Sequence, residues 1–174
     1  PGEISLTGLG SEQNQLISTS KTFEMPVHPS LPSGAYPLVW EFQSRTGERK
    51  KGEIAVPVRG AQARFTDVSV LKASSPEGPS LATSLRLSSS HALKALLNLQ
   101  ITGPAGTPLP ARETAVQLIA GSQEIAQSLP FKPDQAGIWH LSYTLSTVLP
   151  EGAGLPREPI ILASGSVLID AGDA

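Results

Sequence analysis

Two segments of this chain, about a hundred residues apart, carry the same residue pattern. Residues 33–42 read SGAYPLVWEF and residues 136–145 read AGIWHLSYTL. At a constant offset of 103 residues, the aligned pairs are Gly34 with Gly137, Tyr36 with Trp139, Leu38 with Leu141, Trp40 with Tyr143 and Phe42 with Leu145. Both copies place large apolar residues at every second position, which is the period of a β-strand with one face in a core. The repeat therefore predicts two tandem domains of one kind.

The second part of the chain contains seven segments with this alternation. They are residues 65–72, 81–87, 95–101, 115–120, 124–131, 138–148 and 160–169. Turn-forming stretches rich in glycine and proline separate them, and the chain has 16 residues of each type. We predict a complete seven-stranded β-sandwich over residues 64–174.

One of these segments has a second interpretation. Residues 91–99 contain several alanines and leucines, which are good helix formers, so a helix is the alternative there. The alternation continues through Ile101 to a Gly103-Pro104 turn, which favours a strand.

The first part of the chain contains only four or five such segments, at residues 4–9, 15–18, 22–27, 35–43 and 53–58. They correspond in order to the later strands of the second domain, so residues 1–60 are predicted to form an incomplete sandwich, with a short linker at 61–63. A sandwich without its opening strands exposes part of its core face and an unpaired edge. We expect the missing N-terminal part of the same precursor, another protein adding a strand, or packing on the second domain to complete it.

The start of the repeated strand also resembles a known family. Pro32-Ser33-Gly34-Ala35-Tyr36 and Asp134 to Trp139 are similar to the Pro-x-Gly-x-Tyr start of a late strand in the bacterial immunoglobulin-like (Ig-like or fibronectin-III-like) tandem repeat domains of secreted or surface proteins. The resemblance implies an all-β fold of two tandem immunoglobulin-like β-sandwiches, the N-terminal one incomplete, in an extracytoplasmic location. The glycine is expected to have a positive φ, and the aromatic residue to close the end of the sandwich.

Composition excludes several function classes. The net charge is −2 with a pI near 5.9, and the only cationic cluster, at Arg45, Arg49, Lys50 and Lys51, reads as a solvated hairpin tip, so nucleic acid binding is not expected. The chain has no cysteine. No apolar run is long enough to cross a bilayer, so membrane insertion is not expected. The chain begins at Pro1, and we expect it to be a fragment of a larger protein.

Candidate reactive groups are few. Ser89, Ser90 and His91 could supply a hydroxyl and an imidazole, but adjacent strand residues point to opposite faces and no carboxylate partner is evident. Neither His28 nor His140 has metal-ligand spacing with another histidine, so zinc is not expected. We predict no catalytic, cofactor-binding or metal residues and no cofactor.

Two weaker interpretations stay open. A weak calcium site could use carboxylates from a set comprising Glu3, Asp67, Asp170 and Asp173. A sugar platform could use Tyr36, Trp40, Trp139 and Tyr143, although their shared parity with leucines favours core packing.

Together these observations predict a non-catalytic segment of a larger exported bacterial protein that acts as an adhesive, spacer or protein-binding module. The alternative is an accessory domain of a secreted hydrolase that acts on a polysaccharide or a peptide. The two differ in whether a catalytic domain lies elsewhere in the precursor.

Overall fold

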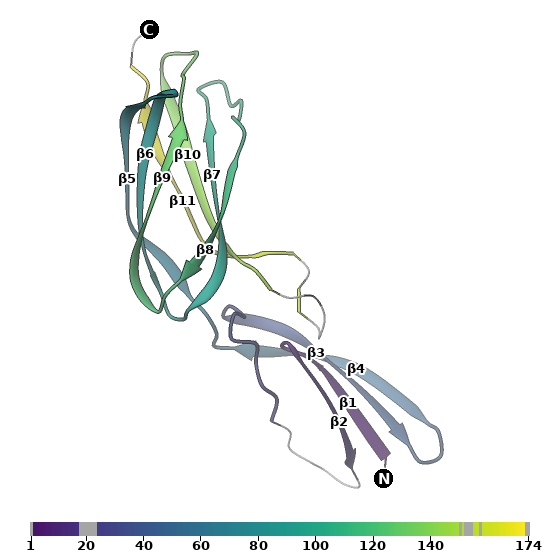
Figure 1. Cartoon of the computed structure of the whole chain (residues 1–174). Helices are drawn as coiled ribbons and strands as arrows, with labels where there is room; N and C mark the ends of the chain where they lie inside the picture. The colour runs from purple at the N-terminus through teal and green to yellow at the C-terminus, as the bar shows by residue number, and fades with distance from the viewer. Residues whose placement is uncertain (1, 18–23, 150, 152–154, 157, 173–174) are drawn as a thin grey trace. The chain divides into compact units, whose positions relative to one another are not determined.

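The computed structural model describes residues 2–17, 24–149, 151, 155–156 and 158–172 of the chain (Figure 1). Within these residues eleven strands form three sheets, with the orders β2-β1-β3-β4, β11-β10-β7-β8 and β5-β6-β9, and no helix is present. No stretch of the described chain therefore qualifies as a membrane-crossing helix. The prediction of an all-β chain is confirmed.

The chain forms two compact units. Unit 1 comprises residues 1–61 and 148–160, and unit 2 comprises residues 62–147 and 161–174. The first boundary falls within the predicted linker, but its residues are tied into the units: the Ala61 amide donates to the Leu31 carbonyl at 2.9 Å, and the Gln62 amide donates to Ser90 Oγ at 2.8 Å. Residues 148–160, which the sequence analysis placed in the second domain, group with unit 1.

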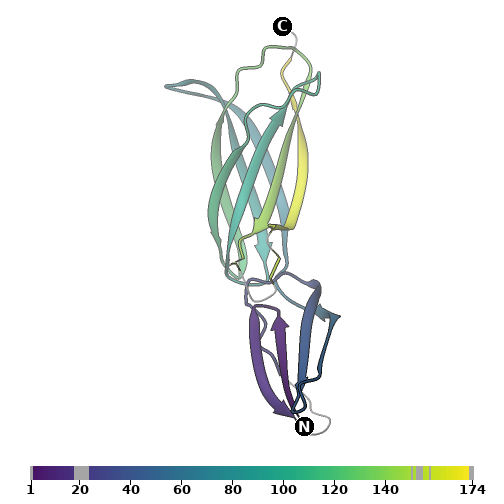
Figure 2. The ribbon, with the colours of Figure 1, turned by 90° about the vertical axis from the view of Figure 1, so that its right-hand side faces the viewer.

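Unit 2 contains the seven predicted strands, arranged in two sheets. Figures 1 and 2 show them in two views that differ by a 90° rotation. One sheet has β5 (Ala63–Ser75), β6 (Gly78–Ser89) and β9 (Gly121–Pro130); the other has β7 (Leu93–Thr102), β8 (Arg112–Leu118), β10 (Ile138–Thr147) and β11 (Ile160–Asp170). The alternative helix at residues 91–99 is wrong, because alternate side chains of β7 are buried from Leu93 to Ile101.

The two sheets of unit 2 share one hydrophobic core. Leucines at alternate positions of β6 and β10 are fully buried, and the ring of Phe65 on β5 contacts the ring of Tyr143 on β10 edge to face, with centroids 4.7 Å apart. The pairing of β5 with β6 shifts register between Phe65 and Asp67. This bulge explains why Phe65, at an odd position, and Val68, at an even one, can both face the core.

Unit 1 contains a single sheet, made of β1 (Gly2–Gly8), β2 (Ser11–Ile17), β3 (Gly34–Ser44) and β4 (Arg49–Val58). Its order, β2-β1-β3-β4, is the order β8-β7-β10-β11 of the four-stranded sheet in unit 2. The described part of unit 1 has no sheet that corresponds to β5-β6-β9.

The predicted strand at 22–27 is wrong for its described residues, since residues 24–28 are irregular and residues 22–23 lie outside the described chain. Hydrogen bonds from side chains of β2 hold this segment, in place of the backbone hydrogen bonds that would pair a strand with its neighbour. Ser11 Oγ donates to the Pro26 carbonyl at 2.6 Å, and Gln13 Nε2 donates to the Glu24 carbonyl at 2.8 Å. Pro26 and Pro29 also lack the amide that strand pairing needs.

Each unit contains a close contact between an aromatic ring and a glycine on the neighbouring strand. Trp40 on β3 lies against Gly52 on β4, and Tyr143, its repeat counterpart, lies against Gly165 on β11. A Cβ added at Gly52 would lie 2.7 Å from Trp40 Cε2, and one added at Gly165 would lie 2.6 Å from Tyr143 Cζ. Glycine therefore makes room for a ring that crosses from the neighbouring strand.

Gly165→Ala is expected to destabilise unit 2 by about 1–3 kcal/mol, because the Tyr143 ring is held by Phe65 and cannot move away without strain. Gly52→Ala is expected to cost less, since the half-buried Trp40 ring has no ring partner among the described residues and can turn outward. Urea unfolding of both variants checks this, with Ser164→Ala as the exposed control. A larger loss at Gly52 than at Gly165 would contradict it.

Candidate functional site

The structure brings Ser90 and His91 together, contrary to the expectation that they face apart. Ser90 Oγ and His91 Nδ1 are 2.7 Å apart, because the chain bends directly after β6 ends at Ser89. Ser90 Oγ also accepts the Gln62 amide at 2.8 Å, and Ser89 Oγ donates to the His91 carbonyl at 2.7 Å. Among the described residues the His91 ring has no carboxylate partner. These contacts stabilise a turn and do not form a triad.

Among the described residues, the candidate calcium ligands form no metal-binding cluster. The described residues contain no group of three or more histidine or acidic residues able to hold a metal ion. Asp170 Oδ1 accepts the Gly172 amide at 2.8 Å, and Asp173 lies outside the described residues. The weak calcium site stays a prediction.

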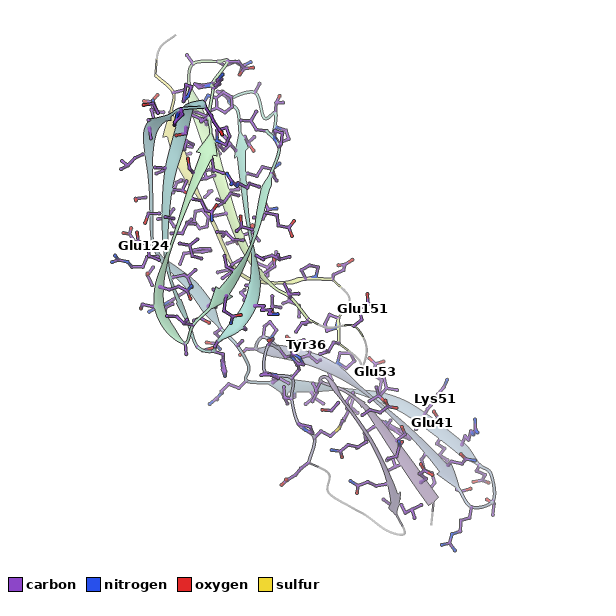
Figure 3. The ribbon with its side chains drawn as sticks, in the orientation of Figure 1. Tyr36, Glu41, Lys51, Glu53, Glu124 and Glu151 are labelled. Atoms are coloured by element: carbon purple, nitrogen blue, oxygen red, sulfur yellow. The ribbon has the colours of Figure 1, made fainter. Side chains whose placement is uncertain are left out.

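Charged groups on the surface are held in local structural contacts. The cationic residues 45 and 49–51 are exposed at the β3–β4 hairpin, where the Ser44 amide donates to the Glu48 carbonyl at 2.8 Å. In unit 2, a hydrogen bond from the Ser84 hydroxyl, together with nearby Arg86, lowers the pKa of exposed Glu124 (Figure 3). Beside the hairpin, Arg45 lines an open cavity of about 430 Å³ together with Glu3, Leu16, Gln43 and Ser44.

The repeated aromatic residue closes the same corner in both units. Tyr36 Oη donates to the Pro32 carbonyl at 2.6 Å, and Trp139 Nε1 donates to the Gln135 carbonyl at 3.1 Å. Both donors reach four residues back, so the repeat preserves the bond although the ring differs. Both rings are buried, which confirms core packing for them. Gly137 has the expected positive φ of 121°, whereas Gly34 is not among the positive-φ residues.

Burial raises the pKa of the Tyr36 phenol. Its folded state prefers the neutral form, so the associated stability is present below the ordinary pKa of about 10 and is lost as pH rises through the higher folded value. Unit 1 is therefore expected to lose stability above pH about 10. Tyr36→Phe should cost about 1–1.5 kcal/mol at neutral pH and remove this phenol's alkaline dependence.

Urea unfolding between pH about 7 and about 11 measures both effects, because this range extends from neutral pH past the ordinary tyrosine pKa of about 10. A Trp139→Phe background leaves Trp40 emission alone to report on unit 1. Tyr143→Phe in unit 2 is the matched control. An unchanged alkaline loss in Tyr36→Phe would show that another group is responsible.

One face of the unit 1 sheet is apolar and incompletely covered. We call it the open face: Ile4, Leu6, Leu38, Trp40, Phe42, Ile54 and Val56, which the strand register places on one side. Leu141 and Leu145 of unit 2 are 0% exposed, whereas their repeat counterparts, Leu38 and Phe42, are only half-buried. Ile54, opposite Leu38 on β4, is 52% exposed. The difference arises because no second sheet faces these side chains in the part of unit 1 that the structure describes.

A groove of about 540 Å³ runs over this open face. Leu6, Leu38, Ile54 and Val56 form its floor, while Met25 and Val27 belong to the irregular segment after β2. At one end lies a buried cluster of Leu9, Leu31 and Tyr36, against which Leu149, Leu155 and Ile160 pack. We call this groove the unit 1 groove; its lining is Leu6, Leu9, Met25, Val27, Leu38, Ile54, Val56, Pro57, Val58 and Arg59.

The opposite side of the sheet is polar. Glu41 is the cross-strand partner of Lys51, and Figure 3 shows both with Glu53 along β3 and β4. Strand alternation puts these residues on the side away from Trp40. These charged side chains of unit 1 thus lie on the face opposite the groove, which also exposes Leu16 and Val39 at 79% and 44%.

Sequence reasoning found part of this site and missed the rest. The alternation of Leu38, Trp40 and Phe42, with too few strands to cover them, predicted an exposed core face. Met25 and Val27 were missed as groove walls, because alternation suggested a strand there. The prolines at positions 26 and 29 were the available signal.

Comparison with solved structures finds limited similarity. A DUF4785 family protein from Legionella pneumophila subsp. pneumophila str. Philadelphia 1 has 15% identity and a TM-score of 0.42, covering 93% of this chain and 48% of that protein. A tetra-tandem repeat in the extending region of a large adhesion protein has 17% identity and a TM-score of 0.37, covering 95% of this chain and 42% of that one. The chain thus spans less than half of either structure. No family model and no curated protein matches the sequence.

Proposed function

We propose that this chain is a non-catalytic, immunoglobulin-like segment of a larger exported bacterial protein, located outside the cytoplasm, and that it acts as an adhesive, spacer or protein-binding module. The seven strands of unit 2, in facing sheets of four and three, support an immunoglobulin-like sandwich. The matching four-stranded sheet supports unit 1 as part of a second one.

The open face of unit 1 is the observation that carries the binding role. Soluble proteins rarely expose a contiguous apolar surface, and where they do it often marks an interaction site. Here the apolar residues are contiguous across β1, β3 and β4, and a groove runs over them. In this proposal the partner is a polypeptide segment outside residues 1–174, from the same precursor or from another protein.

Display of the chain on a non-adherent cell tests this role. Cells that display the native chain should attach to protein-coated surfaces, and the soluble chain should compete. Ile54→Lys should abolish attachment, because it places a charge on the exposed floor of the groove. Val39→Lys, at a 44% exposed position on the other face, should leave attachment unchanged.

Two results would overturn the proposal. Retention on immobilised polysaccharide that Ile54→Lys does not alter would favour the accessory domain of a hydrolase. Turnover of an ester, peptide or glycoside that His91→Ala abolishes would show that the chain is catalytic.

A further inference from the structure

The four-stranded sheets of the two units match in strand order and in individual side chains. Besides the common strand order, the hydrogen bond from the Tyr36 side chain to a carbonyl four residues earlier matches that from Trp139. The contact of Trp40 with Gly52 likewise matches that of Tyr143 with Gly165. Agreement at this level means that the apolar faces of the two sheets have corresponding layouts. Unit 2 therefore indicates what kind of surface fits the open face of unit 1.

In unit 2 the hairpin of β5 and β6 is part of the layer that covers the corresponding face. Leu81, Leu85 and Leu87 on β6 are 0% exposed, and Phe65 on β5 contacts Tyr143. β6, the central strand of that sheet, thus buries every second side chain, and three of these four, Leu81, Leu85 and Leu87, are aliphatic while the fourth is Thr83. The hairpin is an antiparallel pair of strands with one apolar face that is buried against the other sheet.

In unit 1 no described element takes this place. The Trp40 ring, counterpart of Tyr143, has no ring partner within the described residues, and it lies on the same sheet face as Leu38 and Ile54, which line the groove. The segment at 24–28 reaches the groove only through Met25 and Val27. Gln13 Oε1 is also buried and has no hydrogen-bond donor among the described residues.

We propose that the unit 1 groove binds a β-hairpin, supplied by a polypeptide segment outside residues 1–174, whose strands carry an aliphatic side chain at every second position. This inference rests on the proposed function, because it names the chemistry of the partner at the same face. The aliphatic side chains fill the groove over Leu6, Leu38 and Ile54, as those of β6 fill the core of unit 2. Burial of apolar surface drives the association.

Trp40 is a natural reporter for this binding. The chain has two tryptophans, Trp40 in unit 1 and Trp139 in unit 2, so Trp139→Phe leaves Trp40 alone. The probe is a cyclised peptide of residues 63–89, the β5–β6 hairpin, which contains no tryptophan. The control peptide carries Leu81→Asp and Leu85→Asp.

The native probe should shift Trp40 emission to the blue in a saturable manner, and the control peptide should not. Ile54→Lys should weaken binding at least tenfold, and Val39→Lys should change it less than twofold. Amide exchange should slow in β1 and β3. As a second measurement, a copy of residues 63–92 fused ahead of residue 2 should raise the resistance of unit 1 to urea.

Several results would overturn the inference. One is that Trp40 emission shows no saturable shift and the fusion does not raise the resistance of unit 1 to urea. Another is that Ile54→Lys and Val39→Lys weaken hairpin binding equally. A third is that the groove binds dodecanoate but not the hairpin. Self-association that Ile54→Lys abolishes, without hairpin binding, would identify a second copy as the occupant and also overturn it. If displayed cells attach through Ile54 but the hairpin neither binds nor competes, the inference fails and the proposed function stands.

Discussion

Replacing Leu141 with alanine is expected to destabilise unit 2 by about 3 kcal/mol, whereas Leu38→Ala is expected to destabilise unit 1 by no more than about 1 kcal/mol. The two leucines occupy the same position of the repeated strand, 103 residues apart. Leu141 is fully buried beneath the facing sheet, so its loss leaves a cavity. Leu38 is half-exposed at the groove, so little additional cavity forms.

Urea unfolding in single-tryptophan backgrounds separates the two units. Trp40→Phe leaves Trp139 to report on unit 2, Trp139→Phe leaves Trp40 to report on unit 1, and each alanine variant is compared with its own background. Leu145→Ala and Phe42→Ala form a second matched pair with the same expected order. Equal losses in the two units would mean that the open face is covered, and the docking proposal would lose its basis.

Leu155→Asp is expected to destabilise unit 1 by about 2 kcal/mol and to leave unit 2 nearly unchanged. Leu155 lies in the connection between β10 and β11, which the sequence assigns to the second domain. It nevertheless packs against the buried cluster of Leu9, Leu31 and Tyr36 in unit 1. An aspartate there loses apolar burial and brings a charge toward a cluster that offers it no partner.

Amide exchange under native conditions measures this effect unit by unit. Protection should fall in β1 and β3 and persist in β7 and β10. Leu168→Asp is the matched control, because Leu168 lies on β11, after the connection, and is 66% exposed. Loss of protection in β7 and β10 with β1 and β3 intact would contradict the assignment of residues 148–160 to unit 1.

The strands of unit 2 could be predicted because their signal is local. In β6, for example, each of Leu81, Thr83, Leu85 and Leu87 lies on the buried side, as the period of two requires. Two local inferences failed where the chain leaves that period. Residues 24–28 alternate but are held by side chains of β2, and Ser90 meets His91 because the strand has already ended.

The sequence by itself determined the strand pattern, the repeat, and the shortage of strands in the first part, because hydrophobic periodicity and turn residues act over a few positions. Only the tertiary structure decided that one face of unit 1 forms a groove beside Met25 and Val27, and that residues 148–160 complete its cluster. The packing of Leu155 against the cluster that contains Tyr36, for example, joins segments more than a hundred positions apart, and no local pattern records such packing.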